Sequence, residues 1–497
     1  MKEMEIGKTT KTKTPIQISL KERKQGTYVV GTTGTGKSTF LKNVIFQDMD
    51  NDHNHGLCIL DPHGDLIDDL LEVVPENRKD DVILFDPYET DRPFGLNLLD
   101  CDPNNPNEKR WVVSNMIGTI ERLFTIYGPV MDYVLRHTLM TLFTFPRFTL
   151  IELSHLLLAS PEEADYLAKT LKDTSLKKFW ANFPRSHRQR SEMVFSTLNK
   201  LTPFTLDDMM RNIIGQQENT INIQEVMDEG KILFVNLSKG NLGESNSSLL
   251  GSVIVNQILM AALRRKSIPE NDRKQFHLIV DEFQNFATES FAILQSEARK
   301  YGVDVTVAHQ YRDQLDDLNL GSTLNVGNMI LFRVTGHDSK DLASQFNNKP
   351  PEADTKVEPV YAPYYHQGKE FLVEAKLSTD EGALHQEVDL PKRTYGDVEL
   401  EMANSLSCLP DYHAWCRIIR KPEDPLKPPW LEEVRVLTEH MTEELGDPEM
   451  AIYIRARSKK MGRPKEEVEA EIFDNEFKII PDDYIESMTE ESTSESI

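Results

Sequence analysis

The chain has 497 residues and a formal net charge of −25 at pH 7, with 81 Asp and Glu residues against 56 Lys and Arg residues. A chain of this length holds about two to four domains and can bury a large core. Its acidity excludes the broad basic surface of proteins that coat nucleic acid, so any contact with DNA is expected to be local. The first residues contain no apolar core of a secretory signal, which favours a cytoplasmic location.

The N-terminal part of the chain predicts a strand, a glycine-rich loop and a helix in succession. Residues 1–26 predict an arm with one edge strand near residues 16–20. The apolar run 27–30 predicts a strand, and residues 39–45 predict a helix. The stretch between them reads Gly-Thr-Thr-Gly-Thr-Gly-Lys-Ser, at residues 31–38. A loop of this kind between a strand and a helix is the pattern of a phosphate-binding loop.

The loop predicts a site for a nucleoside triphosphate. Its glycines let backbone N–H groups turn inward around an anion. Lys37 is expected to reach the β- and γ-phosphates, and the hydroxyl of Ser38 is expected to bind Mg²⁺. The predicted cofactors are therefore ATP and Mg²⁺. The residues expected to bind the nucleotide are Gly31, Thr32, Thr33, Gly34, Thr35, Gly36, Lys37, Ser38 and Thr39.

Further apolar runs alternate with helical patterns and predict a mostly parallel sheet. The runs lie at residues 56–60, 82–85, 232–235, 277–280, 303–307 and 329–332. From about residue 103 to 224 the sequence shows only helical periodicity, which predicts an all-helical insertion. The apolar residues 249–263 predict a buried helix and not a membrane span, because the run is short and contains Asn256 and Gln257.

Two acids follow the apolar run that ends at Val280. Asp281 is expected to hold Mg²⁺ together with Ser38, and Glu282 is expected to orient and deprotonate an attacking water. The second acid favours nucleotide hydrolysis over nucleotide binding alone. Two interpretations stay open for the turn at residues 61–64: it fixes Asp61 or His63 near the nucleotide, or it is purely structural.

Residues 291–302 predict a helix that ends at Gly302, with Arg299 in its last turn. The helix macrodipole alone favours a cation at that place. The alternative is an arginine finger that stabilises charge on the transferred phosphoryl group in a neighbouring subunit. Gln310 is expected to sense the γ-phosphate or to position the water.

These motifs resemble those of the HerA/FtsK branch of RecA-like P-loop ATPases, and within it the conjugative coupling proteins of type IV secretion systems (the TraG/TraD-like group). The resemblance implies an α/β fold: a RecA-like P-loop NTPase core with a mostly parallel sheet, interrupted by an all-helical insertion. It implies hexameric rings that move DNA, catalysis by Lys37, Glu282, Arg299 and Gln310, and a metal at Ser38 and Asp281. The stretches that carry the resemblance are residues 28–39, 61–66, 95–99, 280–286 and 297–310.

The resemblance also suggests how the chain is divided. The transmembrane helices common in coupling proteins and the β-barrel common in HerA proteins are not recognisable at the N-terminus, so no direct membrane insertion is expected. The expected divisions are an N-terminal arm and edge strand (1–26), the first half of the ATPase domain (27–102), the helical insertion (103–224), the second half of the ATPase domain (225–349), a small appendage (350–440) and a helical to disordered acidic tail (441–497).

The predicted function is an ATP-hydrolysing, homo-hexameric DNA translocase in conjugative DNA transfer or type IV secretion coupling. The alternative is a HerA-like ATPase subunit, or a nucleotide-dependent scaffold of a DNA-processing or defence complex with a nuclease or membrane-associated partner. A small-molecule kinase is a weaker alternative, because adjacent acids at 281 and 282 suit attack by water.

Two basic stretches are candidates for contact with DNA. Residues 177–190 combine Lys and Arg with aromatic residues that could stack on bases, or they form a solvated helix face above a buried aromatic core. Residues 459–465 contain Gly-Arg-Pro, which resembles the core of an AT-hook, or they form an ordinary turn.

Overall fold

The computed structural model describes residues 3–50, 55–102, 104–124, 128–315, 317–346, 355–359, 361–366, 369–374, 385–389, 395–419, 430–436, 444–474 and 478–481.

The centre of the fold is an 11-stranded sheet with the strand order β2-β1-β15-β14-β9-β3-β8-β7-β4-β6-β5. In this order the strands from β9 to β5 run parallel, and the strands from β2 to β14 form an antiparallel edge. This confirms the predicted α/β class with a mostly parallel sheet. The strands are β1 (Met4–Thr9), β2 (Pro15–Ile18), β3 (Thr27–Val30), β4 (Gly56–Asp61), β5 (Val82–Phe85), β6 (Ile232–Asn236), β7 (Phe276–Val280), β8 (Val303–His309), β9 (Asn328–Leu331), β14 (His413–Ile418) and β15 (Trp430–Val436).

Two smaller sheets have two strands each. One pairs β10 (Thr355–Pro359) with β13 (His385–Asp389), and the other pairs β11 (Tyr361–His366) with β12 (Lys369–Glu374).

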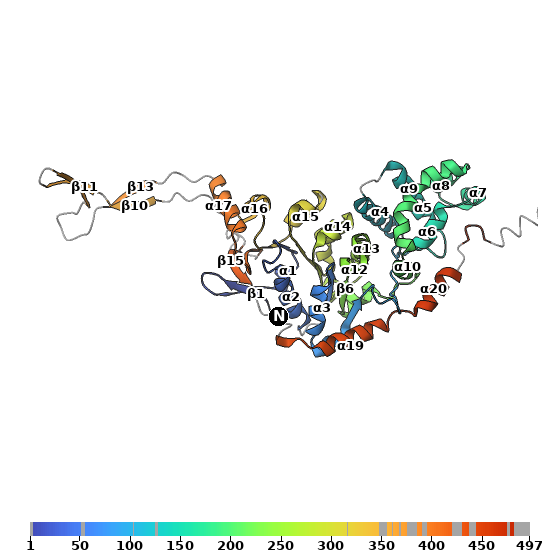
Figure 1. Cartoon of the computed structure of the whole chain (residues 1–497), viewed down its shortest axis with the longest axis horizontal. Helices are drawn as coiled ribbons and strands as arrows, with labels where there is room; N and C mark the ends of the chain where they lie inside the picture. Colours follow the sequence, from blue (N-terminus) through green and yellow to red (C-terminus); the bar gives the residue numbers. More distant parts are fainter. Residues whose placement is uncertain are drawn as a thin grey trace, which may run out of the picture.

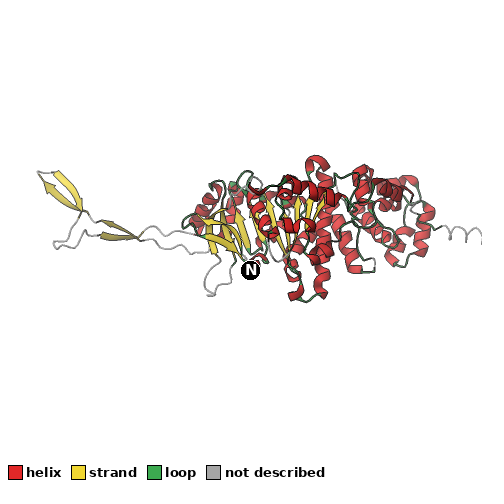
Figure 2. Ribbon diagram, turned by 90° about the horizontal axis from the view of Figure 1, so that it is seen from below, coloured by secondary structure: helices red, strands yellow, loops and turns green. Residues whose placement is uncertain are grey.

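Helices cover both faces of the main sheet (Figure 2). Successive residues of a strand point to opposite faces: in β3, Tyr28 and Val30 belong to one apolar core and Val29 belongs to the other. The core around Val29 includes residues of α2, α3 and α19, and the core around Tyr28 includes residues of α4, α13 and α14. The helices are α1 (Leu20–Arg23), α2 (Lys37–Met49), α3 (Asp65–Glu72), α4 (Pro106–Leu123), α5 (Pro129–Leu142), α6 (Leu150–Leu157), α7 (Pro161–Thr170), α8 (Thr174–Ala181), α9 (His187–Leu206), α10 (Asp208–Ile214), α11 (Ile223–Glu229), α12 (Lys239–Leu242), α13 (Glu244–Arg264), α14 (Glu289–Glu297), α15 (Asp317–Leu324), α16 (Gly336–Ala343), α17 (Tyr395–Ser407), α19 (Pro448–Lys459) and α20 (Lys465–Asp474).

The described residues between β5 and β6 form helices and no strands. Helices α4 to α10 gather at one end of the molecule, beside the sheet (Figure 1). Local signals set where two of them begin, because Thr149 and Ser160 each form a capping box with a glutamate three residues later, at the starts of α6 and α7. These capped helices surround an apolar core of their own residues that is continuous with one face of the sheet.

The first strands of the chain and two strands between residues 413 and 436 extend the sheet in a way that the sequence did not predict. The first residues form two strands, β1 and β2, and not one edge strand. β14 and β15 lie in the stretch predicted as an appendage, yet they pair with β9 and β1 in the main sheet. Gly7 lies opposite Val436, so this pairing joins distant parts of the sequence. Local periodicity carries no information about such a partner.

α13 is the one helix in the described part of the chain that is long and apolar enough to cross a membrane. Within its most apolar window, 89% of the residues are buried inside the protein. It packs against α4, α11 and α14. Burial on all sides is typical of a core helix, which confirms the predicted buried helix.

The C-terminal helices connect the sheet to the helical end of the molecule. α19 packs on α3 and β5, and α20 packs on α10 (Figure 1). The Ser458 hydroxyl accepts a hydrogen bond from the Leu84 N–H at 3.0 Å. The same segment also packs tightly at Gly462. A Cβ added to Gly462 would lie 2.0 Å from the carbonyl oxygen of Arg92, so a larger residue would not fit there. The segment from α19 to α20 therefore bridges the two parts of the fold.

Candidate functional site

The glycine-rich loop lies between the end of β3 at Val30 and the start of α2 at Lys37. Two of its glycines are required by the geometry. Gly36 has a φ of 109°, a backbone conformation that residues with a side chain rarely adopt. A Cβ on Gly31 would lie 2.5 Å from the Cβ of Phe332, so only glycine fits there. The loop is therefore shaped by close backbone contacts and opens directly onto the N-terminal end of a 13-residue helix. Free N–H groups at a helix N-terminus favour an anion.

Three of the predicted catalytic side chains meet at this loop. The Nζ of Lys37 donates to Oε1 of Glu282 at 3.0 Å, and Nε2 of Gln310 donates to the same oxygen at 3.0 Å. Thr33 in turn donates from its hydroxyl to Oε1 of Gln310 at 3.2 Å. Lys37 and Glu282 are buried, and Gln310 is half-buried. The loop, the acid after β7 and the glutamine after β8 thus form one connected group.

Two side chains that the sequence motifs did not predict hold Glu282 in place. Nε2 of Gln284 donates to Oε2 of Glu282 at 2.7 Å. Nδ2 of Asn285 donates to the backbone carbonyl of Glu282 at 2.7 Å, and Asn285 is itself held by Lys239. Glu282 has a φ of 44°, an uncommon conformation for a side-chain-bearing residue, so these bonds stabilise a strained backbone. The signal in the sequence was two amides, Gln284 and Asn285, separated from the acids by Phe283.

The electrostatics keep Glu282 ionised. Burial by itself raises the pKa of this carboxyl group. The positive charge of Lys37 and the hydrogen bonds from Gln284, Lys37 and Gln310 outweigh burial, so the pKa of Glu282 lies below its usual range. A carboxylate that stays charged can accept a proton from a water molecule at neutral pH.

Asp281 has the opposite shift. Burial raises the pKa of Asp281 to about 6, opposed by Lys37 and reinforced by the negative charges of Glu282 and Asp61. One of its oxygens accepts the backbone N–H of Glu282 at 3.0 Å. A buried carboxylate in an excess of negative charge suits a cation, and oxygen ligands are those that Mg²⁺ prefers. Ser38 lies exposed in the first turn of α2. Its hydroxyl and the Asp281 carboxylate supply oxygen ligands that fit the predicted ion.

The remaining loop residues support the backbone of the site. Thr32 donates from its N–H to the carbonyl of Arg333 at 2.9 Å, and the Thr35 hydroxyl donates to the carbonyl of Thr32 at 2.7 Å. Gly34 has a φ of 79°. Thr39 lies in α2, where its carbonyl accepts a hydrogen bond from Asn43.

Asp61 has a structural role. Its carboxylate accepts the N–H groups of His63, Leu66 and Ile67, at 2.8, 3.0 and 3.2 Å, and so closes the turn and caps the start of α3. His63 is exposed. Asp61 still acts on the site through its charge, which contributes to the raised pKa of Asp281.

Arg299 lies away from this group. It is exposed in the 3-10 turn Ala298–Tyr301, which Gly302 ends with a φ of 77°. Among the interactions of the described residues, Arg299 contacts the side chain of Gln25 and not Lys37, Glu282 or Gln310. The predicted helix end is thus confirmed, and action on a neighbouring subunit stays a prediction.

The two basic stretches differ from the predicted surfaces for DNA in which side chains are accessible. Phe179, Trp180 and Phe183 are buried and pack on one another, so they are closed to bases. This supports the alternative of a solvated helix face. The residues of the Gly-Arg-Pro turn contact other parts of the chain. Gly462 packs against Arg92, and Arg463 pairs with Glu471. These contacts favour the alternative of an ordinary turn, since the arginine of an AT-hook must enter a groove.

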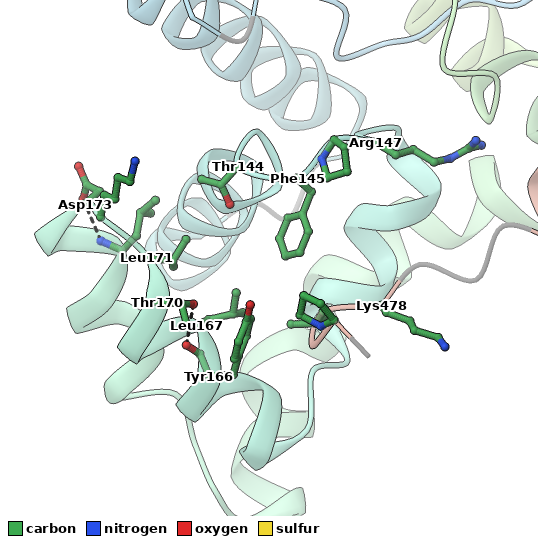
Figure 3. Close-up of a pocket in the computed structure, with 14 residues that line it drawn as sticks. Thr144, Phe145, Arg147, Tyr166, Leu167, Thr170, Leu171, Asp173 and Lys478 are labelled. Carbon is green, nitrogen blue, oxygen red and sulfur yellow. Dashed lines mark hydrogen bonds between the residues drawn. The ribbon is translucent and has the colours of Figure 1, made fainter. Parts of the chain in front are cut away.

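A separate cavity of about 940 Å³ lies in the helical end of the molecule (Figure 3). Phe145 and Tyr166 point toward it, whereas Arg147 and Lys478 point away. Residues 478–481 form one of its walls, and Ile479 is buried there. The cavity contains none of the predicted site residues.

Residues 10–324 match a known family, described as the type IV secretion-system coupling protein DNA-binding domain. Among curated proteins, the uncharacterized protein aq_aa31 of Aquifex aeolicus (strain VF5) is 43% identical over 49 residues, which are 10% of this chain and 18% of that protein. The chain therefore matches only a small part of the length of that relative.

Several solved structures share the fold. The bacterial conjugative coupling protein TrwBdeltaN70 is 16% identical with a TM-score of 0.54, over 88% of this chain and 90% of that chain. VirB4 of Thermoanaerobacter pseudethanolicus is 11% identical with a TM-score of 0.53, over 90% of this chain and 98% of that chain. At these identities the likeness shows the fold alone, and it confirms the predicted RecA-like architecture.

One of these structures contains ligands of the predicted kind. The plasmid coupling protein TrwB in complex with ADP and Mg²⁺ is 15% identical with a TM-score of 0.52, over 87% of this chain and 90% of that chain. TrwB also forms a complex with the non-hydrolysable ATP analogue ADPNP.

Proposed function

Because the chain belongs to the family of type IV secretion-system coupling protein DNA-binding domains, we propose that it is an ATP-hydrolysing DNA translocase of conjugative DNA transfer or type IV secretion coupling. One observation carries the proposal: Lys37 of the phosphate loop and Gln310 both donate to Oε1 of the ionised Glu282. A loop that only bound a nucleotide would not need a charged base beside its lysine.

The proposed cofactors are ATP and Mg²⁺. The loop from Gly31 to Thr39 binds the phosphates, and Ser38 and Asp281 bind the cation. The complexes of TrwB with ADP and Mg²⁺ and with ADPNP support this choice. Mg²⁺ would neutralise charge on the β- and γ-phosphates when it is bound.

The residues of the site then divide the chemistry. The phosphates compete with Glu282 for Lys37, because both are anions within its reach. Once Lys37 turns to the phosphates, Glu282 keeps its hydrogen bonds to Gln284 and Gln310 and is free to accept the proton of the attacking water. Gln310 stays beside the same oxygen and positions the water. Burial of Lys37 and Glu282 strengthens each of these interactions.

The proposal includes a homo-hexamer that moves DNA on the cytoplasmic side of the membrane. In a ring, Arg299 completes the site of the adjacent subunit, and its exposure in this chain is compatible with that role. DNA contacts come from a local surface, because the chain is acidic overall. A membrane-associated or nuclease partner would link the ring to its transfer system.

The test is ATP hydrolysis by the full chain with and without single- and double-stranded DNA, over a range of salt concentrations. We expect hydrolysis that requires Mg²⁺ and that at least one form of DNA stimulates, with stimulation falling as salt rises because phosphate contacts release counterions. Lys37→Ala and Glu282→Gln are expected to abolish it. A variant of an exposed residue far from the loop, Glu162→Gln in α7, is the matched control.

Two outcomes would contradict the proposal. If neither form of DNA stimulates hydrolysis at any salt concentration, the chain is not a DNA translocase. If the transfer system stays active with Glu282→Gln and fails with Lys37→Ala, nucleotide binding alone is needed, and the chain is a nucleotide-dependent scaffold.

A further inference from the structure

The order of strands in the sheet indicates how a bound nucleotide is oriented along the sheet edge. Gln310 follows β8, and Glu282 follows β7, and both strands lie on one side of β3. β9 and β14 lie on the other side of β3. If the γ-phosphate of a nucleoside triphosphate lies near Lys37 and Glu282, as the proposed function requires, the ribose and base extend toward β9 and β14. The residues at that flank are therefore the ones available to the base.

Tyr412 occupies this flank. It directly precedes β14, and β14 runs antiparallel to β9, so Tyr412 lies at the sheet edge where β3 and β9 end. Its backbone N–H donates to the carbonyl of Thr35 at 2.8 Å. A Cβ on Gly36 would lie 2.8 Å from Cδ1 of the Tyr412 ring. The ring is thus in contact with the last glycine before Lys37, on the side away from Glu282.

The backbone holds this ring in an uncommon conformation. Tyr412 has a φ of 63°, in the left-handed region that a bulky residue rarely adopts. Such a residue persists when its surroundings fix it, and these outliers gather at ligand sites. Here the carbonyl of Tyr412 accepts the N–H of Val436 at 3.0 Å, in addition to the bond from Tyr412 to Thr35.

Arg333 ties the same turn to the phosphate loop. Its guanidinium donates to the carbonyl of Leu409 at 3.0 Å and pairs with Asp411 at 2.8 Å. Its own carbonyl accepts the N–H of Thr32 at 2.9 Å. The turn before β14 and the phosphate loop therefore keep a fixed distance. Tyr412 packs against the apolar core around Val29 and is half-buried, so part of the residue remains exposed.

We propose that the ring of Tyr412 is the surface on which the base of a bound nucleoside triphosphate stacks. The inference rests on the proposed function for the direction of the nucleotide, and it adds the contact for the base. Stacking uses the face of a base and not its hydrogen-bonding edge, so the ring accepts adenine and guanine alike. It contributes affinity for the nucleoside, and the loop contributes affinity for the phosphates.

The test compares binding of Mg·ATP and Mg·GTP with binding of inorganic tripolyphosphate, which has the phosphates and no base. Calorimetry on the full chain measures all three. Tyr412→Gly removes the ring and suits the positive φ, and Tyr412→Phe keeps the ring. Tyr88→Ala is the control, because Tyr88 is an exposed tyrosine that follows β5 at the far end of the same sheet.

We expect Tyr412→Gly to weaken binding of ATP and GTP about tenfold and to leave binding of tripolyphosphate unchanged. Tyr412→Phe and Tyr88→Ala should bind all three as the wild type does. The inference is overturned if Tyr412→Gly binds ATP normally, or if it loses ATP and tripolyphosphate by the same factor, since the ring then only supports the loop. These are binding measurements, so they do not depend on hydrolysis or DNA. A wild-type chain that binds neither ligand would contradict the proposed function itself.

Discussion

The ammonium group of Lys37 lies 3.0 Å from Oε1 of Glu282, and both side chains are buried. The pair joins the residue that is expected to bind phosphate to the residue that is expected to activate water. In this arrangement the general base Glu282 is paired with Lys37, the residue that the phosphates of the nucleotide also need. Nucleotide binding and release of the Glu282 carboxylate from Lys37 are therefore linked through one ion pair.

Lys37→Ala is expected to destabilise the protein as well as to abolish nucleotide binding. It leaves the carboxylate of Glu282 buried without its counter-charge, at a cost of about 3 kcal/mol. Because Lys37 lowers the pKa of Glu282, its stabilising effect is fully present above the usual pKa of a glutamate and is lost as the pH falls through the lowered pKa of Glu282. Thermal unfolding should show a large difference from the wild type at pH 7, and this difference should shrink as the pH falls below the usual pKa of a glutamate.

The double variant Lys37→Ala with Glu282→Gln is the control for this effect. It should recover much of the stability at pH 7, since the buried carboxylate of Glu282 is removed together with its counter-charge. A single Lys37→Ala variant that is as stable as the wild type at pH 7 would show that the pair is not buried in solution.

Asp281→Asn is expected to stabilise the protein in the absence of Mg²⁺. The pKa of Asp281 is raised to about 6, so the folded state binds this proton more tightly than the unfolded chain does. The native state therefore gains from protonation below the ordinary pKa of an aspartate, and this gain is lost as the pH rises through about 6. Asn removes a penalty on the order of 2–3 kcal/mol at pH 7 to 8.

Unfolding in urea measures this directly. The difference between Asp281→Asn and the wild type should shrink below pH 5, and addition of Mg²⁺ with nucleotide should stabilise the wild type only. A variant that is less stable than the wild type at pH 8 would mean that Asp281 makes a favourable contact in its charged form.

Gln310→Ala is expected to lower kcat and to leave KM for ATP nearly unchanged. The side-chain amide of Gln310 donates to Glu282 at 3.0 Å. Without this amide, Glu282 and the attacking water are misplaced, whereas the contacts between the loop and the phosphates are unchanged. The decrease should be about 100-fold, at the lower end of what general-base catalysis contributes. Steady-state kinetics separate the two effects. Gln314→Ala, four residues later in the chain, is the matched control, and a rise in KM with unchanged kcat would assign Gln310 to binding.

The strands that carry the site were predictable from sequence, and the contacts between them were not. The loop from Gly31 to Ser38 and the acids at 281 and 282 stand next to strong apolar runs, so local patterns located them. The bond from Gln284 to Glu282 depends on a strained backbone at Glu282 that no pattern reveals. Tyr412 reaches the loop because β14 joins the sheet beside β9, a pairing across a long stretch of sequence.

The two basic stretches that were candidates for contact with DNA also show that a sequence pattern alone does not reveal which side chains are buried. The spacing of Phe179, Trp180 and Phe183 among Lys and Arg residues suits both a stacking surface and an amphipathic helix. Only burial distinguishes the two, and all three aromatic side chains are buried. For Arg463 the sequence left an AT-hook and an ordinary turn open, and in the structure Arg463 pairs with Glu471 of its own chain, which favours the turn.

Arg299→Ala is expected to inactivate the site of the neighbouring subunit and not its own. Its own contact is with Gln25, away from Glu282. Mixing Arg299→Ala with Lys37→Ala should therefore restore part of the activity, because an intact site can then meet an intact arginine in the same ring. ATP hydrolysis of the mixture, compared with each variant alone, measures the restoration. Lys300→Ala is the control, and a mixture as inactive as its components would contradict action between subunits.

The central claim is that Glu282 activates water for hydrolysis of a nucleotide held by Lys37. Single-turnover hydrolysis of bound Mg·ATP by Glu282→Gln tests it most directly, because binding and chemistry are measured on the same sample. Glu282→Gln should bind ATP at least as tightly as the wild type does, because no carboxylate then competes with the phosphates for Lys37. It should retain the ATP unhydrolysed, with the rate lowered at least about 100-fold. Hydrolysis at the wild-type rate by this variant would show that Glu282 is not the general base.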